Sequence, residues 1–190
     1  MTRRSLAVML ALMLLAAGAA AQQSPIASGT VKEGRLSFDG RATAGDFTGV
    51  TTTVTGAMEG GPELAGVRGW VEAPVATLKT GNDRRDRDLN KSMESGKYPV
   101  IRFELERVEP GSGSEDSLPV TLHGRLMIHG ETREVTLPAT LGFPDSTVRV
   151  RSTFPLNLKE YRIGGLSKML GILKMYEDIV VHVDVTFAAQ

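Results

Sequence analysis

Residues 118–143 read L-P-V-T-L-H-G-R-L-M-I-H-G-E-T-R-E-V-T-L-P-A-T-L-G-F, and apolar residues alternate with polar ones through both halves of this sequence. Such a period of two is typical of a β-strand with one buried face. The halves are separated by His129-Gly130-Glu131-Thr132, where Gly130 can adopt the positive φ of a tight turn. The pattern predicts two antiparallel strands, Leu118–Ile128 and Arg133–Phe143.

The same alternation continues on both sides of this hairpin. Apolar residues occupy one face of further segments at Thr30–Asp39, Gly45–Met58, Leu64–Leu78, Val100–Val108, Val148–Leu156 and Asp178–Ala188, and Gly45–Met58 reads as one curved strand or a bent pair. Together they make about eight strands. Consecutive amphipathic strands are most simply arranged as a closed antiparallel barrel, because closure leaves no exposed edge. We therefore expect an all-β fold, an antiparallel eight-stranded barrel.

Two segments interrupt the strand pattern and are predicted to be short helices. The first covers residues 82–95, where Asn82 can cap the first turn and Leu89 and Met93 form a narrow apolar stripe. The second covers Leu166–Tyr176, whose apolar residues lie at helical spacing. Because this second helix is apolar over most of its surface, we expect it to be covered, either over the barrel or in a homodimer.

The amino terminus has the pattern of a secretory signal peptide. Two arginines precede an apolar run at residues 6–17, and small residues lead up to Ala21. The run is shorter than the roughly 20 residues of a membrane-spanning helix. We expect residues 1–21 to be cleaved, which leaves 22–190 as one domain in the periplasm or outside the cell.

The composition argues against several classes of function. The chain has 22 basic and 22 acidic residues, which gives no indication of a nucleic-acid partner. It has no cysteine, so disulfides and thiolate metal sites are excluded. Of its three histidines, His123 and His129 lie on one strand about 20 Å apart, and His182 can approach only one of them. Because a metal site needs three or four converging ligands, we expect neither a metal nor a cofactor.

No motif indicates catalysis. The sequence has no recognisable nucleophile motif and no glycine-rich phosphate loop after a strand. Residues 83–88, D-R-R-D-R-D, contain carboxylates, but the mixed charges on a helix favour a solvated, self-paired surface. A less favoured interpretation places one of these arginines at a tunnel mouth, against the polar head group of a ligand. We expect a protein without enzymatic activity.

The order of these parts resembles the YceI-like family. The resemblance rests on the Arg-Asp-containing helix that leads into Y-P-V-I-R-F at 98–103 and on G-R-L-M-I-H-G-E-T-R-E-V-T-L-P-A at 124–139. It extends from about Thr30 to Phe187. The resemblance implies a lipocalin-like barrel that binds a long amphiphile, a polyisoprenoid or an isoprenoid quinone, in an apolar tunnel.

Inward-facing apolar residues are the candidate ligand contacts. On the strands they are Phe38, Phe47, Val71, Ile101, Phe103, Leu126, Leu137, Phe154, Val181 and Val183, and in the second predicted helix, as a lid or tunnel wall, Leu166, Met169, Leu170 and Leu173. The alternative for each of them is ordinary core packing, since apolar alternation specifies a core whether or not it encloses a cavity.

Three hypotheses for the function follow. The first is an exported barrel that carries, stores or shields a polyisoprenoid or quinone-like amphiphile, with transient membrane contact. The second is a barrel with a filled core that acts as an interaction or stress-related module through surfaces such as Trp70 or the helix at 82–95. The third is an enzyme that acts on a lipid.

Overall fold

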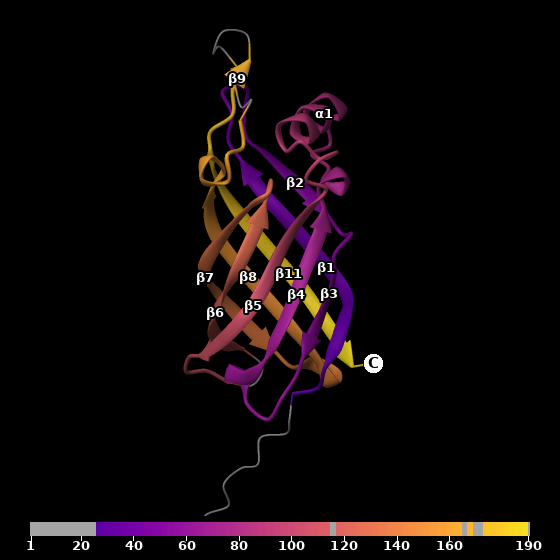
Figure 1. The fold of residues 1–190 in the computed structure, drawn as a ribbon, viewed down its shortest axis with the longest axis vertical. Coiled ribbons are helices and arrows are strands. Elements are labelled where there is room, and N and C mark those ends of the chain that lie inside the picture. Colours follow the sequence, from indigo (N-terminus) through magenta and orange to yellow (C-terminus); the bar gives the residue numbers. More distant parts are fainter. Residues whose placement is uncertain (1–25, 115–116, 165–166, 169–172, 190) are drawn as a thin grey trace, which may run out of the picture.

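The chain forms a closed antiparallel barrel (Figure 1). A computed structural model describes residues 26–114, 117–164, 167–168 and 173–189. The wall strands are β1 (Gly29–Gly40), β2 (Phe47–Thr51), β3 (Thr55–Glu59), β4 (Arg68–Pro74), β5 (Val100–Pro110), β6 (Leu118–Ile128), β7 (Glu131–Gly142), β8 (Thr147–Asn157) and β11 (Asp178–Ala189). Because β2 and β3 both pair with β1, they occupy one position in the wall, and pairing of β1 with β11 closes the ring. The predicted eight-stranded antiparallel barrel is confirmed.

The barrel interior is formed by one face of each strand. The buried hydrophobic residues of β6 are Val120, Leu122, Leu126 and Ile128. The paired strand β7 has buried Leu137, Ala139 and Leu141. Successive side chains of a strand point to opposite faces, so this register directs both apolar rows inward. The predicted alternation thus produces the core.

The β6–β7 hairpin has a tighter turn than the predicted four residues. His129 and Gly130 have φ values of 54° and 76°, and pairing begins again at Glu131. Positive φ at both central residues matches the twist of the flanking strands. A Cβ atom on Gly130 would lie 2.4 Å from the ring of Tyr98, so this position needs glycine for space as well as for conformation.

The first predicted helix is α1 (Asp83–Ser92), at one end of the barrel (Figure 1). The Asn82 side chain accepts hydrogen bonds from the backbone N–H groups of Arg84 and Arg85, both at 3.1 Å, as a helix cap does. Within the described residues, no helix has the length and apolar character needed to cross a membrane. Short 3-10 turns are η1 (Leu64–Gly66), η2 (Val75–Thr77), η3 (Pro144–Ser146) and η4 (Leu158–Tyr161).

The second predicted helix, Leu166–Tyr176, is wrong for the residues described there. β9 (Ser167–Lys168) pairs antiparallel with β10 (Leu173–Lys174), and β9 lies at the same end of the molecule as α1 (Figure 1). A short apolar segment has no reliable periodicity, and Gly171 lowers its helix propensity by about 1 kcal/mol relative to alanine. Leu166, Met169 and Leu170 lie outside the described residues.

Candidate functional site

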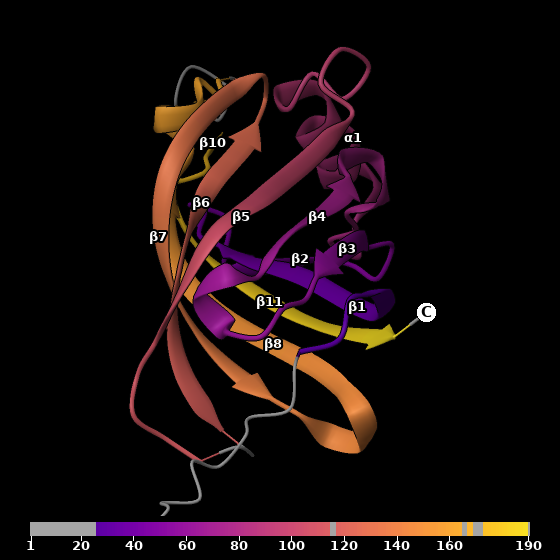
Figure 2. The same ribbon diagram turned by 60° about the horizontal axis from the view of Figure 1, so that its bottom comes forward.

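The barrel interior contains a cavity of about 610 Å³. Ligand pockets in proteins typically have volumes of about 300–1,000 Å³. The lining includes Phe47, the first residue of β2, and Phe187, close to the carboxyl end of β11. The start of β2 lies near α1, and the end of β11 lies at the opposite end of the barrel (Figures 1 and 2). The cavity is therefore elongated along the barrel, and the interior is not the solid core that the second hypothesis requires.

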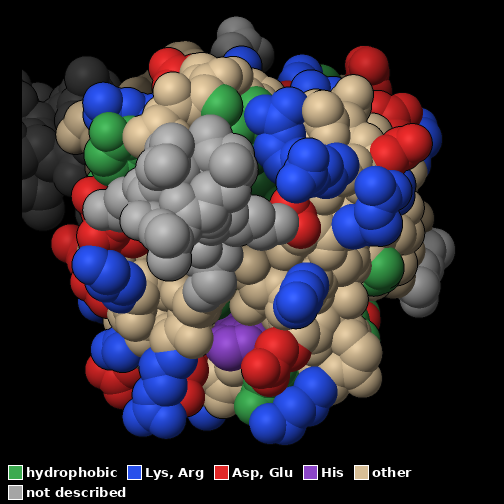
Figure 3. All heavy atoms as spheres, turned by 90° about the horizontal axis from the view of Figure 1, so that it is seen from above, with side chains coloured by type: hydrophobic (Ala, Val, Ile, Leu, Met, Phe, Trp, Pro, Cys, Tyr) green, Lys and Arg blue, Asp and Glu red, His purple; other side chains and the backbone are tan. Residues whose placement is uncertain are grey.

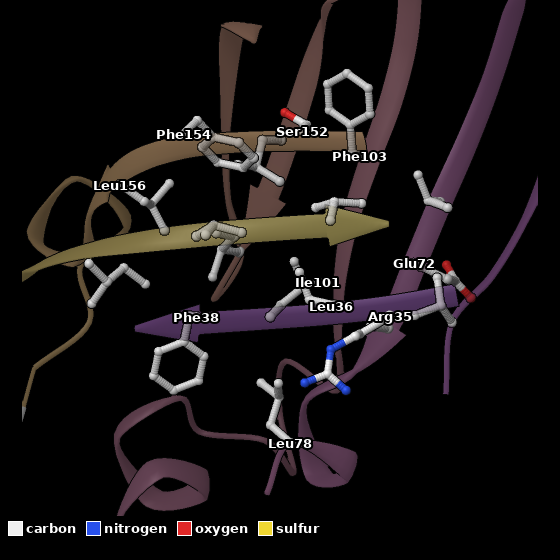
Figure 4. Close-up of a pocket in the computed structure, with 18 of the residues that line it drawn as sticks. Arg35, Leu36, Phe38, Glu72, Leu78, Ile101, Phe103, Ser152, Phe154 and Leu156 are labelled. Atoms are coloured by element: carbon white, nitrogen blue, oxygen red, sulfur yellow. The ribbon is translucent and has the colours of Figure 1, made fainter. Parts of the chain in front are cut away.

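The wall of the cavity is mainly apolar. Figure 4 shows the rings of Phe38, Phe103 and Phe154 around it, with Arg35 and Glu72 on the side away from Phe154. Two polar wall residues already have partners: the Ser152 hydroxyl donates to the backbone oxygen of Pro138 at 2.6 Å, and Glu72 accepts from Arg102 at 2.9 Å. Such a wall suits hydrocarbon more than a polar solute.

Helix α1 and the loop between β1 and β2 add a more polar rim at one end of the cavity. From α1 and its caps the lining includes Asn82, Arg84, Arg85, Asp88, Leu89, Ser92 and Met93, and from the loop Ala42, Thr43, Ala44 and Gly45. Figure 3 views this end and shows Lys and Arg side chains gathered beside the Asp and Glu side chains. We call this set of residues the α1 rim.

One arginine of the α1 rim has an unusual environment. The guanidinium carbon of Arg85 lies 4.3 Å from the centre of the Phe47 ring, a distance at which a cation is attracted to the ring face. Its Nε atom is buried and has no hydrogen-bond partner among the described residues. The sequence placed Arg85 on a solvated surface, which is wrong for this half-buried residue.

The three histidines lie apart and each has a different partner. His123 contacts Glu109 at 3.1 Å, His182 contacts Asp39 at 2.8 Å, and Nδ1 of His129 donates to the backbone oxygen of Tyr161 at 3.1 Å. In the described part of the chain, no group of three His, Cys, Asp or Glu side chains could hold a metal ion.

Residues 28–187 match the family model of the YceI-like domain. The chain belongs to the YceI-like family. A comparison with curated proteins gives no match. The barrel is also similar in fold to several solved structures.

Three solved structures illustrate this similarity. BcnA of Burkholderia cenocepacia has a TM-score of 0.70 and 16% identity, with 80% of this chain and 95% of BcnA covered. A polyisoprenoid-binding domain from Saccharophagus degradans, implicated in plant cell wall breakdown, has a TM-score of 0.71 and 15% identity, with 87% and 99% covered. The YceI protein of Campylobacter jejuni has a TM-score of 0.59 and 16% identity, with 75% and 85% covered.

All of the strand residues predicted as ligand contacts line the cavity of this YceI-like barrel. They are Phe38, Phe47, Val71, Ile101, Phe103, Leu126, Leu137, Phe154, Val181 and Val183. Four of them point inward but are only half-buried, because their side chains border the empty space of the cavity: Val71, Ile101, Phe103 and Val183. Of the predicted lid, Leu173 lies in β10 and the others lie outside the described residues. Ligand contact by any of these residues stays a prediction.

Asp86 holds α1 to the segment that precedes it, where Lys79 pairs with Val50 of β2. Its carboxylate is 7% exposed and accepts hydrogen bonds from the Thr80 backbone N–H at 2.8 Å and from the Thr80 hydroxyl at 2.7 Å. Burial raises the pKa of Asp86, but these hydrogen bonds and the positive charges of Lys79 and Arg85 outweigh that effect, so the pKa lies below its ordinary value.

Replacing Asp86 with asparagine is expected to lower the free energy of unfolding by about 1–2 kcal/mol at neutral pH, because charge-assisted hydrogen bonds become neutral ones. A carboxylate with a lowered folded-state pKa stabilises fully above its unfolded pKa of about 3.9 and loses this contribution as the pH falls through the folded pKa. The difference between wild type and D86N should therefore shrink below about pH 4.

Urea unfolding of both proteins at neutral and acidic pH tests this prediction. The matched control is Asp83→Asn, which removes the same charge at an exposed position of the same helix and should cost less than about 1 kcal/mol. A D86N deficit that stays constant from neutral to acidic pH would contradict the assigned role.

Proposed function

We propose that this YceI-like protein is an exported binding protein that holds a polyisoprenoid or an isoprenoid quinone in its barrel without changing it chemically. The observation that carries the proposal is the elongated apolar cavity, whose lining runs from Phe47 to Phe187. A linear hydrocarbon chain suits such a space better than a compact polar solute does. The similarity to a domain described as polyisoprenoid-binding supports this ligand class.

The energetics of hydrocarbon burial are sufficient for such binding. Each buried CH₂ group contributes about 0.8 kcal/mol, so one five-carbon isoprenoid unit contributes roughly 4 kcal/mol before costs. Micromolar affinity requires only about 8 kcal/mol net. Two or three enclosed units therefore reach this affinity unless ordering and association costs take up most of the gain.

The chemistry of the wall supports binding rather than catalysis. The Ser152 hydroxyl, which lines the cavity, donates to the main chain and not to a general base. Each of the three histidines contacts another group of the protein: Glu109, Asp39 or the backbone oxygen of Tyr161. Because a free polyisoprenoid or isoprenoid quinone resides in a membrane, we further propose that the protein contacts a membrane transiently during loading and release of the ligand.

Native mass spectrometry of the protein purified from its own cellular compartment tests the proposal. We expect a stoichiometric apolar adduct that organic solvent releases and that fragments as an isoprenoid chain, on a polypeptide that begins near Gln22 if the leader is cleaved. An empty protein that also fails to bind added isoprenoid chains would contradict the binding function. A polypeptide that retains residues 1–21 would contradict cleavage of the leader but not the binding function.

A further inference from the structure

The outer surface of the barrel has a second hollow, of about 270 Å³, over β1, β11 and β8, which are neighbours in the wall (Figure 1). Leu36, Val183 and Ser152 of these strands line the interior cavity, so the residues next to them in sequence point outward. We call this hollow the outer groove. Its outward residues are all polar or charged: Arg35, Ser37, Arg151, Thr153, His182 and Asp184.

The strand register places two arginines in one row across the outer groove. Asp184 of β11 pairs with Arg35 of β1 on one side and with Arg151 of β8 on the other. Neighbouring strands lie about 4.8 Å apart, so the backbones of the two arginines are roughly 10 Å apart. Because both side chains line the same groove, a small ligand bound there can contact both.

The carboxylate between these arginines is already paired with a third arginine. Arg149 donates from Nε to Oδ1 of Asp184 at 2.8 Å and from Nη2 to Oδ2 at 2.6 Å. These hydrogen bonds hold the pKa of Asp184 below its ordinary value. Among the described residues, Arg35 and Arg151 make no side-chain hydrogen bond or salt bridge. The groove therefore has two guanidinium groups that no protein acceptor occupies.

A hydroxyl group in the next row also lacks a partner. Ser37 is 7% exposed and lines the outer groove. Its side chain makes no hydrogen bond within the part of the chain that the structure describes. A buried donor without an acceptor is costly, so an acceptor atom of a ligand in the groove would stabilise it.

The nearby carboxylates do not take up these donors. Asp39 accepts a hydrogen bond from Thr48 at 2.8 Å and contacts Nε2 of His182 at 2.8 Å. The hydrogen bond from His182 holds the pKa of Asp39 below its ordinary value, so this carboxylate is ionised and directed to the histidine. Glu33, further along β1, does not line the groove and interacts with Arg149. The outer groove thus offers donors to an anion from outside.

We propose that the outer groove binds a phosphate group, which a phospholipid head group or a free phosphate ester would supply. The guanidinium of arginine forms paired hydrogen bonds with phosphate oxygens. Donors come from Arg35 and Ser37 on one side and from Arg151 on the other, which suits the tetrahedral oxygens of a phosphate better than the two oxygens of a carboxylate. Because the groove lies on the outside of the barrel, this site does not depend on the ligand proposed for the interior.

Two binding measurements at low salt test this proposal: calorimetric titration with glycerol 3-phosphate, and cosedimentation with phosphatidylcholine vesicles that contain or lack phosphatidylglycerol. Arg151→Met should lower the affinity for whichever of these ligands binds by at least about tenfold. Arg151 is chosen because Arg35 also lines the interior cavity. Arg151→Lys keeps the charge but lacks the planar fork, so it should retain only part of the affinity. Acetate should bind at least about tenfold more weakly than glycerol 3-phosphate.

Lys32→Met is the matched control, because Lys32 is an exposed residue of β1 that does not line the outer groove. It removes the same charge from the same side of the barrel and should change the affinity by less than about twofold. Thermal unfolding of each variant verifies that it is folded.

The two measurements also distinguish the sources of the phosphate. Saturable binding of glycerol 3-phosphate without vesicle binding would assign the groove to free phosphate esters. Binding to phosphatidylglycerol vesicles that R151M weakens would assign it to lipid head groups. The proposal is overturned if wild type binds neither, if R151M binds as tightly as wild type, if K32M loses as much affinity as R151M, or if acetate binds as tightly as glycerol 3-phosphate.

Discussion

Replacing Val183 with tryptophan is expected to lower the affinity for a long prenyl chain by at least about tenfold while the barrel stays folded. Val183 lies on β11 between Leu36 of β1 and Ser152 of β8, and all three line the cavity. An indole at this point would occupy the middle of the space. Excluding one isoprenoid unit removes roughly 4 kcal/mol of gross stabilisation, and each tenfold loss of affinity corresponds to about 1.4 kcal/mol.

Val180→Trp is the matched control, because it makes the same change on the same strand. Val180 points outward and is 40% exposed, so V180W should change the affinity by less than about twofold. Urea unfolding of the ligand-free proteins gives the second measurement. Overpacking a filled core costs about 1–3 kcal/mol, whereas V183W should cost less than about 1 kcal/mol because the indole enters existing space. Unchanged affinity in a folded V183W would mean that the chain does not pass through the middle of the barrel.

The inward faces could be predicted from the sequence because strand geometry leaves little freedom. Once β6 and β7 are recognised as a hairpin, the period of two assigns each residue of both strands to either the inner or the outer face. The same reasoning placed Phe38, Phe154 and Val183 on the inner face, where the structure has them. The closed barrel followed from the number of amphipathic strands and the need to protect their edges.

Whether the barrel is hollow could not be predicted from the sequence. Leu126, whose side chain is buried, and Ile101, which stays half-exposed to the cavity, occupy equivalent places in the alternation of their strands. The empty volume depends on how side chains from opposite walls meet, and that depends on the curvature of the barrel and the stagger between its strands. No local pattern contains this information.

The α1 rim could have been recognised from a signal that is present in the sequence. Leu89 and Met93 define the apolar stripe of α1, and the same helical spacing continues back to Asp86 and Arg85. Both residues lie on the inner side of α1, where Asp86 is buried against Thr80 and Arg85 stacks on Phe47. The run of mixed charges concealed this, because the average polarity of a helix does not show which charges face inward.

Replacing Tyr161 with alanine is expected to lower the free energy of unfolding by about 3–5 kcal/mol, the usual cost of truncating a fully buried aromatic residue. Tyr161 lies in η4, is 1% exposed and does not line the cavity. Burial raises the pKa of its hydroxyl. Its backbone oxygen accepts the hydrogen bond from His129, so the loss of packing here also disturbs the β6–β7 turn.

Phe103→Ala makes a similar truncation in the wall of the cavity and provides the comparison. The Phe103 ring is half-buried and already borders empty space, so fewer packing contacts are lost and the cost should be about 1–2 kcal/mol. Both variants are compared with wild type by urea unfolding after removal of any bound lipid, because a ligand that binds only the folded state would raise every value. Equal costs for F103A and Y161A would mean that the interior around Phe103 is packed. If Y161A costs at least about 1.5 kcal/mol more than F103A, the barrel keeps its cavity open without a ligand. If the empty wall collapsed, other side chains would pack against the inward side of Phe103, and its truncation would cost more.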